Sequence, residues 1–264
     1  FDLKGKPTAF KRWRYLEDTR EGIEKQTKKK ALRYVQPKDS LPEIYLPPLA
    51  DWSKIQKDPT VEIAITEGEL KAACCTKLML PCIGLGGVYS FKSKKKESPF
   101  HPLLKSFNWA RRKVYVIYDS DAHTNPMVVA ARNELCRELL SLGALPHITE
   151  LMEGPTGEKL GLADTLFMYG EDHLKTLLGT SKAFAMAEEL FALSEEVAYV
   201  KDPGIVVNMA ASQRMRASDF TTHAYANRHY YEMSHDAEGN DKFTKKKAAK
   251  AWLEWEHRFE LAGM

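Results

Sequence analysis

Three short apolar segments between residues 61 and 121 constrain this chain most, because each ends on residues that suit chemistry better than packing. Val61–Lys71 ends in a turn and a carboxylate, Ile83–Gly87 ends in glycines, and Val114–Asp121 ends in an Asp-x-Asp triplet. Each segment reads as a buried strand, and helical segments alternate with them. This pattern predicts an α/β fold with an open, mostly parallel sheet flanked by helices.

The polar residues at these strand ends are expected to meet. In an open parallel sheet the carboxyl ends of the strands line one crevice, and ligands bind there. Glu67, Asp119 and Asp121 would then share one rim, where three carboxylates repel one another unless a hard divalent cation lies among them. Carboxylate oxygens suit Mg²⁺ or Mn²⁺. Taken singly, Glu67 reads equally well as a helix N-terminal residue favoured by the helix dipole, and the aspartates as loop caps.

Helix and turn signals follow the first strand. Thr66 and Glu69 have the spacing of a capping box, which predicts a helix over residues 70–80. Gly68 lies where a tight turn is needed, because glycine tolerates backbone angles that other residues avoid.

Two later segments complete the strand and helix pattern. The glycines at 84, 86 and 87 are a weak dinucleotide-binding signal, because residues 88–91 look extended and no helix signature follows. Asn125 is a good N-cap and Pro126 a good first helical residue, which predicts a helix to about residue 142.

The composition of the chain changes along its length and suggests four parts. They are a basic, aromatic and proline-rich extension over 1–60, a catalytic core over 61–171, a helical linker over 172–196 and a small α+β segment over 197–264. Within the extension, Phe10–Tyr15 interleaves bases with rings. This pattern indicates a half-buried strand with Trp13 and Tyr15 facing inward, or a surface that stacks on bases.

The C-terminal segment carries a hairpin signal and an aromatic stripe. Asp202–Gly204 is a hairpin-type turn between two extended runs. Residues 245–261 are expected to form a helix with Trp252, Trp255 and Phe259 at helical spacing. A stripe of this kind is more typical of packing than of a binding site.

The net charge of +3 hides an uneven distribution. Residues 1–113 hold 24 basic and 13 acidic side chains, whereas the remaining residues hold 15 and 23. A basic half raises the chance of a polyanionic partner. Each lysine run alone reads as a solvated surface, and their clustering near the carboxylate-bearing strands makes nucleic-acid binding a closer competitor to that interpretation. The runs are Lys28–Lys30, Lys94–Lys96 and Lys245–Lys247.

Cysteine usage and hydropathy set the expected compartment. None of the four cysteines forms a Cys-x-x-Cys pair, so we expect reduced thiols of a cytoplasmic protein and no structural zinc site. No apolar run reaches the length of a membrane span and no signal peptide opens the chain, so we expect no membrane association. Because the first residue is Phe1, the chain reads as a fragment.

The motifs in their order resemble the Toprim domain, which bacterial-type primases, topoisomerases and some nucleases share. The resemblance covers roughly residues 30–170 and is greater to a phage and plasmid branch, whose primase-like, DUF3854-like proteins are often joined to a replicative helicase. The segments that carry it are Ile65–Lys71, Ile83–Phe91, Asp119–Asp121, Asn125–Pro126, Gly157–Lys159 and Gly161–Asp164.

This resemblance implies roles for individual residues. Glu67 would be a metal ligand or a general acid/base, and Asp119 and Asp121 would hold Mg²⁺ or Mn²⁺. Lys71 would lie near the phosphates, and Asp164 is a further metal candidate at the rim. The basic residues before the third strand are candidates for binding phosphates or nucleic acid, namely Arg111, Arg112 and Lys113.

The implied function is primer synthesis by a metal-dependent nucleotidyltransferase in phage or plasmid replication. Its substrates would be a single-stranded DNA template and nucleotides, and its partner a replicative helicase. The chain has no Gly-x4-Gly-Lys-Ser/Thr motif, so the helicase ATPase is not within it. His123 follows Asp-x-Asp where many primases place small residues.

Three other functions fit parts of the pattern. A Toprim nuclease would use the same carboxylates to direct water at a phosphodiester, and a nucleic-acid-binding module would keep the fold without catalysis. A haloacid-dehalogenase-type phosphatase also uses Asp-x-Asp after a strand, but it normally has Thr or Val where this chain has His123.

Overall fold

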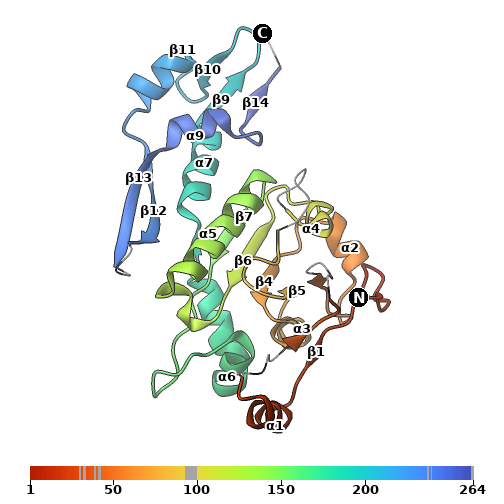
Figure 1. The fold of residues 1–264 in the computed structure, drawn as a ribbon. Coiled ribbons are helices and arrows are strands. Elements are labelled where there is room, and N and C mark those ends of the chain that lie inside the picture. Colours follow the sequence, from red (N-terminus) through yellow and green to blue (C-terminus); the bar gives the residue numbers. More distant parts are fainter. Residues whose placement is uncertain are drawn as a thin grey trace.

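The computed structural model describes most of the chain. It covers residues 1–29, 31, 34–38, 40, 43–92, 100–236, 238 and 240–262, without the side chain of His123. Lys30 and the run Lys94–Lys96 lie outside the described residues. A central sheet with helices on both faces forms the body, and a smaller C-terminal unit lies beside it (Figure 1).

The central sheet has six strands, and its four inner strands run parallel. Its order is β3 (Ile44–Tyr45), β5 (Cys82–Leu85), β4 (Ile63–Glu67), β6 (Lys113–Ile117), β7 (Leu145–Ile148) and β8 (Lys182–Ala183). The two edge strands, β3 and β8, pair antiparallel with their neighbours. The predicted α/β fold with an open, mostly parallel sheet flanked by helices is confirmed.

Some of the described helices cover the two faces of this sheet, and the others belong to the N-terminal extension and the C-terminal unit. They are α1 (Glu17–Thr27), α2 (Trp52–Lys57), α3 (Glu69–Leu78), α4 (Pro102–Lys105), α5 (Pro126–Ser141), α6 (Leu162–Gly179), α7 (Ala185–Glu196), α8 (Ala217–Asp219) and α9 (Ala248–Glu254). A 3₁₀ turn follows β6 at Ser120–His123, and a π turn follows α8 at Phe220–Ala224.

The buried side chains of the sheet divide into two cores, one on each face. Alternate residues of β4 show this, because Ile63 and Ile65 face the core with α2 and α5, whereas Ala64 faces α3 and α6. Strands covered on both faces are apolar along their whole length, which explains the continuous apolar runs of the sequence. Gly84 lets α3 approach closely, since a Cβ there would lie 3.1 Å from that of Ala72.

The helix that follows Asp119 and Asp121 begins as the sequence predicts. Asn125 Oδ1 accepts a hydrogen bond from the Met127 backbone N–H at 3.1 Å, and Pro126 is the first residue of α5. The predicted capping box before α3 is wrong. Gly68 is the N-cap with φ +104°, and the buried Thr66 hydroxyl has no hydrogen-bond partner among the described residues.

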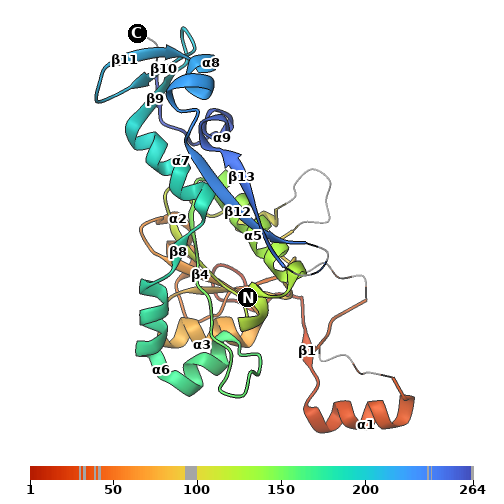
Figure 2. The ribbon, with the colours of Figure 1, turned by 90° about the vertical axis from the view of Figure 1, so that its left-hand side faces the viewer.

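Two further local predictions differ from the structure. Residues 88–91 form turns and not an extended segment. Trp13 and Tyr15 do not face inward, because β1 (Trp13–Arg14) pairs with β2 (Tyr34–Val35) in a small ribbon where Trp13 is 53% exposed. This ribbon and α1 lie to one side of the body (Figure 2).

The described part of the C-terminal unit contains three antiparallel strand pairings and a parallel edge strand. Its strands are β9 (Val197–Val200), β10 (Ile205–Asn208), β11 (Gln213–Arg216), β12 (His229–His235), β13 (Asp241–Lys247) and β14 (Glu260–Leu261). The order β11-β10-β9-β14 forms one sheet, and β12 and β13 form a separate ribbon. The expected turn at 202–204 connects β9 with β10, which pair as a hairpin.

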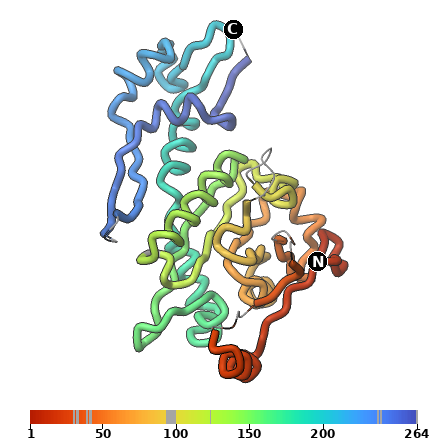
Figure 3. The backbone as a smooth tube through the Cα atoms, viewed as in Figure 1, coloured from red at the N-terminus to blue at the C-terminus, as the bar shows by residue number. Residues whose placement is uncertain are grey.

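Helix α7 leads from the body into this unit (Figure 3). Two tryptophans of the unit belong to the main core. Trp252 is fully buried and donates to Ser194 Oγ at 2.8 Å, while Trp255 donates to the Leu140 carbonyl at 3.0 Å. The packing role predicted for the aromatic stripe holds for these two residues. The predicted helix over 245–261 is reduced to α9, and Phe259 lies beyond it, 42% exposed.

The segment 172–196 is helical for most of its length, but it also supplies β8, which extends the central sheet beside β7. No helix in the described part of the chain is long and apolar enough to cross a membrane.

A fully buried arginine ties the loops at the amino ends of the central strands. Arg112 donates to the carbonyls of Asn108 at 3.0 Å, Val61 at 2.8 Å and Ile55 at 2.7 Å. The hydrogen bond to Ile55 is buried and those to Asn108 and Val61 are partly buried, so loss of the guanidinium would leave carbonyls with restricted access to water short of a donor. The Arg112 guanidinium therefore holds three segments together, namely α2, the segment before β4 and the segment before β6.

We expect Arg112→Ala to destabilise the fold by about 3 kcal/mol or more, since each buried acceptor left without a partner costs about 1–3 kcal/mol. The matched control is Arg111→Ala, whose side chain is exposed and pairs with the exposed Glu195 at 3.5 Å. This change is expected to cost less than about 1 kcal/mol. Urea unfolding of both variants measures the difference, and equal costs would contradict the role of Arg112.

Candidate functional site

The site is built where β4 and β6 lie side by side. These parallel neighbours pair from Ile63↔Val114 to Thr66↔Ile117, so their carboxyl ends reach the same edge of the sheet. The chain leaves β4 toward β5 on one side and returns to β6 on the other. Such a reversal of strand order opens a crevice at the carboxyl ends of the two strands, where ligands bind in open α/β sheets.

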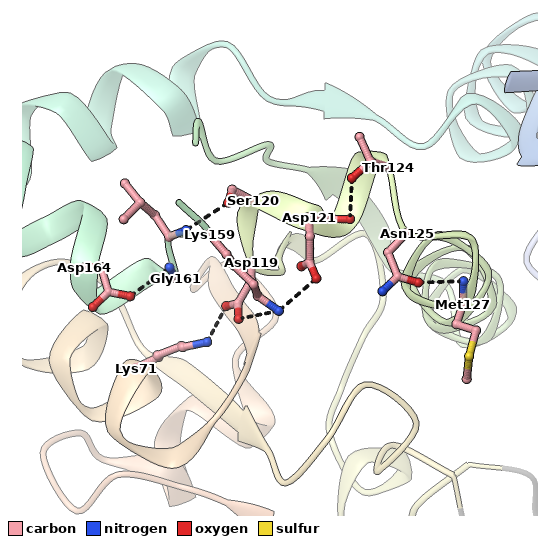
Figure 4. A network of polar contacts seen from close by, with 11 residues as sticks. Lys71, Asp119, Ser120, Asp121, Thr124, Asn125, Met127, Lys159, Gly161 and Asp164 are labelled. Atoms are coloured by element: carbon pink, nitrogen blue, oxygen red, sulfur yellow. Dashed lines mark hydrogen bonds and ion pairs between the residues drawn. The ribbon is translucent and has the colours of Figure 1, made fainter. Parts of the chain in front are cut away.

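Asp119 lies at the centre of this edge. It is the cap residue of the 3₁₀ turn after β6 and is only 8% exposed. Its two carboxylate oxygens face two different lysines, because Lys71 of α3 pairs with Oδ1 and Lys159 lies 3.2 Å from Oδ2 (Figure 4). A nearly buried carboxylate of this kind needs charged partners.

Lys159 bridges the two aspartates of the Asp-x-Asp triplet. Its Nζ lies 3.0 Å from Asp121 Oδ2 as well as 3.2 Å from Asp119 Oδ2. Burial lowers the pKa of Lys159, but the hydrogen bond that its ammonium donates to Asp121 and the charge of Asp119 outweigh this effect, so the pKa is raised. The ammonium group is therefore held charged between the two carboxylates.

The loop over residues 154–161 is fixed against the turn after β6. The Leu160 N–H donates to Ser120 Oγ at 2.9 Å, and the Ser120 N–H donates to the Leu160 carbonyl at 2.8 Å. Gly161 follows, and a Cβ there would lie 2.5 Å from Lys71 Cε and 3.0 Å from Asp119 Oδ1. Only glycine fits this position without moving the lysine.

Glu67 ends β4 beside these charges. Burial raises the pKa of its carboxyl group, the negative charge of Asp119 raises it further, and Lys71 and Lys159 partly offset both. A carboxyl group whose pKa is raised toward neutrality suits proton transfer. Glu67 is therefore a candidate general acid/base.

The residues at this edge fit a hard divalent cation in part. Asp121 Oδ1 is buried and accepts no hydrogen bond from any described residue, so it is an acceptor without a partner. However, the described residues contain no group of three or more His, Cys, Asp or Glu that could hold a metal ion. Asp119 and Asp121 supply two carboxylates that are two residues apart in the chain. That Asp119, Asp121 and Glu67 bind a metal ion stays a prediction.

Asp164 has a local role in the structure. Its Oδ2 accepts a hydrogen bond from the Gly161 N–H at 2.9 Å and so caps α6. Figure 4 shows Asp164 beside Gly161, with no contact to Asp119 or Asp121 drawn. Its predicted place among the metal ligands remains untested.

The three basic residues Arg111, Arg112 and Lys113 lie at the start of β6, whereas Asp119 follows the other end of that strand. Since a strand rises about 3.3 Å per residue, Lys113 and Asp119 are roughly 20 Å apart. The prediction that Arg112 binds phosphate is wrong, because its guanidinium is buried and holds three carbonyls. Arg111 and Lys113 pair instead with Glu195 at 3.5 Å and Glu62 at 4.0 Å.

Two residues of the site were missed from sequence. Lys159 lies within the Gly157–Lys159 segment that carries the Toprim resemblance, so a signal existed, but no role was assigned to it. Arg12 of the extension donates to Glu69 Oε1 at 2.8 Å and to the Gly86 carbonyl at 2.7 Å. It brings a positive charge to the carboxyl ends of β4 and β5, and no sequence spacing predicts this contact.

Comparisons with known proteins give one family and a set of structures. A family described as "Domain of unknown function (DUF3854)" matches residues 51–173, as the resemblance implied. A similar solved structure is the "Crystal Structure of the Aquifex aeolicus primase (Zinc Binding and RNA Polymerase Domains)". The two chains are 17% identical with a TM-score of 0.41, and the match covers 63% of this chain and 38% of the primase chain. No curated protein matches the chain.

We expect Glu67→Gln to raise the melting temperature by a few degrees at pH 7–8 in the presence of a chelator, with the gain disappearing near pH 4. Burial raises the pKa of Glu67 above its unfolded value, so the ionised carboxylate costs folding free energy once the pH exceeds that value. At low pH both states bind the proton and the cost vanishes. Thermal unfolding across this pH range measures the difference.

The exposed carboxylate of Glu153 provides the control, as Glu153→Gln alters no buried charge. A Glu67→Gln variant that is less stable than wild type at pH 8, or a gain that grows toward pH 4, would contradict the assignment.

Proposed function

We propose that this chain is a metal-dependent nucleotidyltransferase of the primase type that forms phosphodiester bonds during phage or plasmid DNA replication. The observation that carries the proposal is the group of Asp119, Asp121, Lys71 and Lys159 at the carboxyl ends of the parallel strands. The match to DUF3854 and the resemblance of the motifs to Toprim domains support it.

The carboxylates and lysines of the site can bind the metal ion and the phosphate groups that phosphodiester formation requires. A divalent metal held by Asp119, Asp121 and Glu67 would activate the attacking 3′-oxygen and neutralise charge at the α-phosphate. Lys71 and Lys159 supply ammonium groups that can pair with phosphate oxygens once a cation replaces them at the carboxylates. In the alternative role, Glu67 leaves the metal to the two aspartates and accepts the proton that the attacking hydroxyl loses.

The proposed partners follow from this reaction. The substrates would be nucleotides and a single-stranded DNA template, and a replicative helicase domain or subunit would accompany the chain in the bacterial cytoplasm. Arg12 adds a cation near the glycines after β5, where its Nη1 lies 2.7 Å from the Gly86 carbonyl. A nucleotide bound there would meet positive charge from the N-terminal extension as well as from the core.

The deciding experiment is primer synthesis on single-stranded DNA with labelled nucleotides and Mg²⁺ or Mn²⁺. We expect short oligomers from the wild type and a loss of at least about 100-fold in Glu67→Gln and in Asp119→Asn/Asp121→Asn. Asp172→Asn is the control, because that carboxylate is exposed and lies outside the site.

Other results would redirect the proposal. Metal-dependent shortening of the substrate, lost in the same variants, would indicate a nuclease that uses these carboxylates. If the folded wild type neither synthesises oligomers nor cleaves the substrate, with or without a helicase, that result would contradict a catalytic site.

We expect Lys159→Ala to bind Mn²⁺ about tenfold more tightly than the wild type. The Lys159 ammonium competes with a divalent cation for Asp119 and Asp121, and its removal leaves the carboxylates without that competitor. Electron paramagnetic resonance of free Mn²⁺ measures the affinity without any need for turnover. Lys105→Ala on α4 is the control, and weaker binding by Lys159→Ala would contradict this competition.

A further inference from the structure

The hairpin of β12 and β13 forms a two-stranded ribbon separate from the other sheet of the C-terminal unit (Figure 1). Its strands pair in register from His229↔Lys247 to His235↔Asp241. Successive side chains of a strand point to opposite faces, so the odd-numbered residues share one face and the even-numbered residues the other.

The even-numbered face of β12 packs against the body. Tyr230 is 7% exposed and belongs to the main core, and Glu232 pairs with Arg137 of α5 at 3.6 Å. Asn133 of the same helix donates to the Met233 carbonyl at 2.8 Å. The odd-numbered face, which we call the outer face, therefore points away from α5 around Tyr231 and over residues 243–247, whereas nearer the hairpin turn the His235 side chain is only 2% exposed.

The outer face presents two aromatic rings and two lysines to solvent. Tyr231 is 54% exposed and Phe243 is 62% exposed, and Lys245 and Lys247 are exposed beside them. Tyr231 is opposite Lys245, which makes Phe243 its diagonal neighbour on the same face, roughly 7–8 Å away. Among the ion pairs of the described residues, none uses either lysine. Large exposed rings next to unneutralised cations have no evident role in packing.

A pocket continues the outer face beyond the end of the ribbon. It has a volume of about 390 Å³, and Lys247 and Lys250 line it together with the side chains of Ser218, Thr221 and Thr222. Glu254 also lines it. Lysines and hydroxyl groups are side chains that bind phosphate oxygens of nucleic acids. The pocket thus extends the basic surface that Lys245 and Lys247 begin, with hydroxyl groups and one carboxylate, Glu254, beside its lysines.

We propose that the outer face and this pocket bind single-stranded nucleic acid. Bases would stack on Tyr231 and Phe243, and phosphates would pair with Lys245, Lys247 and Lys250. Exposed rings within a basic surface are the means by which proteins hold single strands without reading their sequence, because every base has a face that can stack. A duplex would keep its bases paired and away from both rings.

The direction in which β12 runs shows where the outer face lies relative to the edge of the central sheet that carries the carboxylates. The contacts of Glu232 with Arg137 and of Met233 with Asn133 show that β12 runs antiparallel to α5. The His235 end of β12 therefore lies toward the first turn of α5, which begins at Pro126 after the 3₁₀ turn that holds Asp121, and both views show β12 and β13 beside this helix (Figures 1 and 2). A bound strand would lead toward the carboxylates. Only this last step rests on the proposed function.

Fluorescence anisotropy of a labelled oligothymidylate with the full chain tests the proposal. We expect Tyr231→Ala/Phe243→Ala to weaken binding at least about tenfold, with little change in its salt dependence. Lys245→Ala/Lys247→Ala should weaken binding and reduce the slope of log affinity against log salt by about 1.4, as two phosphate contacts are lost.

Matched changes elsewhere provide the controls. Phe167→Ala removes a ring that is 92% exposed on α6, and Lys57→Ala/Lys105→Ala removes the same charge from α2 and α4. Both should bind as the wild type does. Equal losses in controls and ribbon variants, no loss in the ribbon variants, or no binding by the wild type would each overturn the proposal.

Two measurements keep this test separate from the catalytic proposal. Adding Tyr231→Ala/Phe243→Ala to the triple variant Glu67→Gln/Asp119→Asn/Asp121→Asn is expected to weaken oligonucleotide binding by the same factor as adding it to the wild type, whatever the outcome of primer synthesis. Photocrosslinking of wild-type chain to 4-thiothymidine oligonucleotides should give adducts in residues 229–247. Adducts confined to other segments, or binding to phosphatidylserine vesicles without oligonucleotide binding, would overturn the proposal.

Discussion

The ion pair between Lys71 and Asp119 is the interaction on which the site depends. It joins α3, which follows β4, to the turn that follows β6, and so connects the two strands that flank the change in strand order. Asp119 is almost buried, and its charge is tolerated there because lysines contact both of its oxygens. The absence of a side chain at Gly161 leaves room for this pair. Glu67, whose pKa is raised, lies beside the same charges.

The parallel strands and the edge where their polar end residues meet could be predicted because each strand is marked by a local pattern. Apolar runs ending in Glu67, in glycines and in Asp119 gave the parallel strands and the edge where they end. The start of α5 at Asn125 was equally predictable, since an N-cap acts within three residues. The N-cap predicted at Thr66 was wrong, because Thr66 and Glu67 are still part of β4 and the helix N-cap is Gly68.

Contacts between distant segments could not be predicted in this way. Arg112 stands in a basic triplet that reads as a surface, yet it is buried because Ile55, Val61 and Asn108 offer carbonyls to it. The bridge from Lys159 to the two aspartates spans about forty residues, and its geometry depends on how the loop before α6 docks on Ser120. Such partners are set by the tertiary fold and leave no spacing in the sequence.

The short strand β8 affects how the chain can be divided. It comes after α6, beyond residue 171 where the sequence suggests that the core ends, and it covers the outer edge of β7. A fragment cut at residue 171 would leave the backbone groups of that edge without partners, and open strand edges pair readily with other chains. The residues that lead into the C-terminal unit thus also protect the central sheet from self-association.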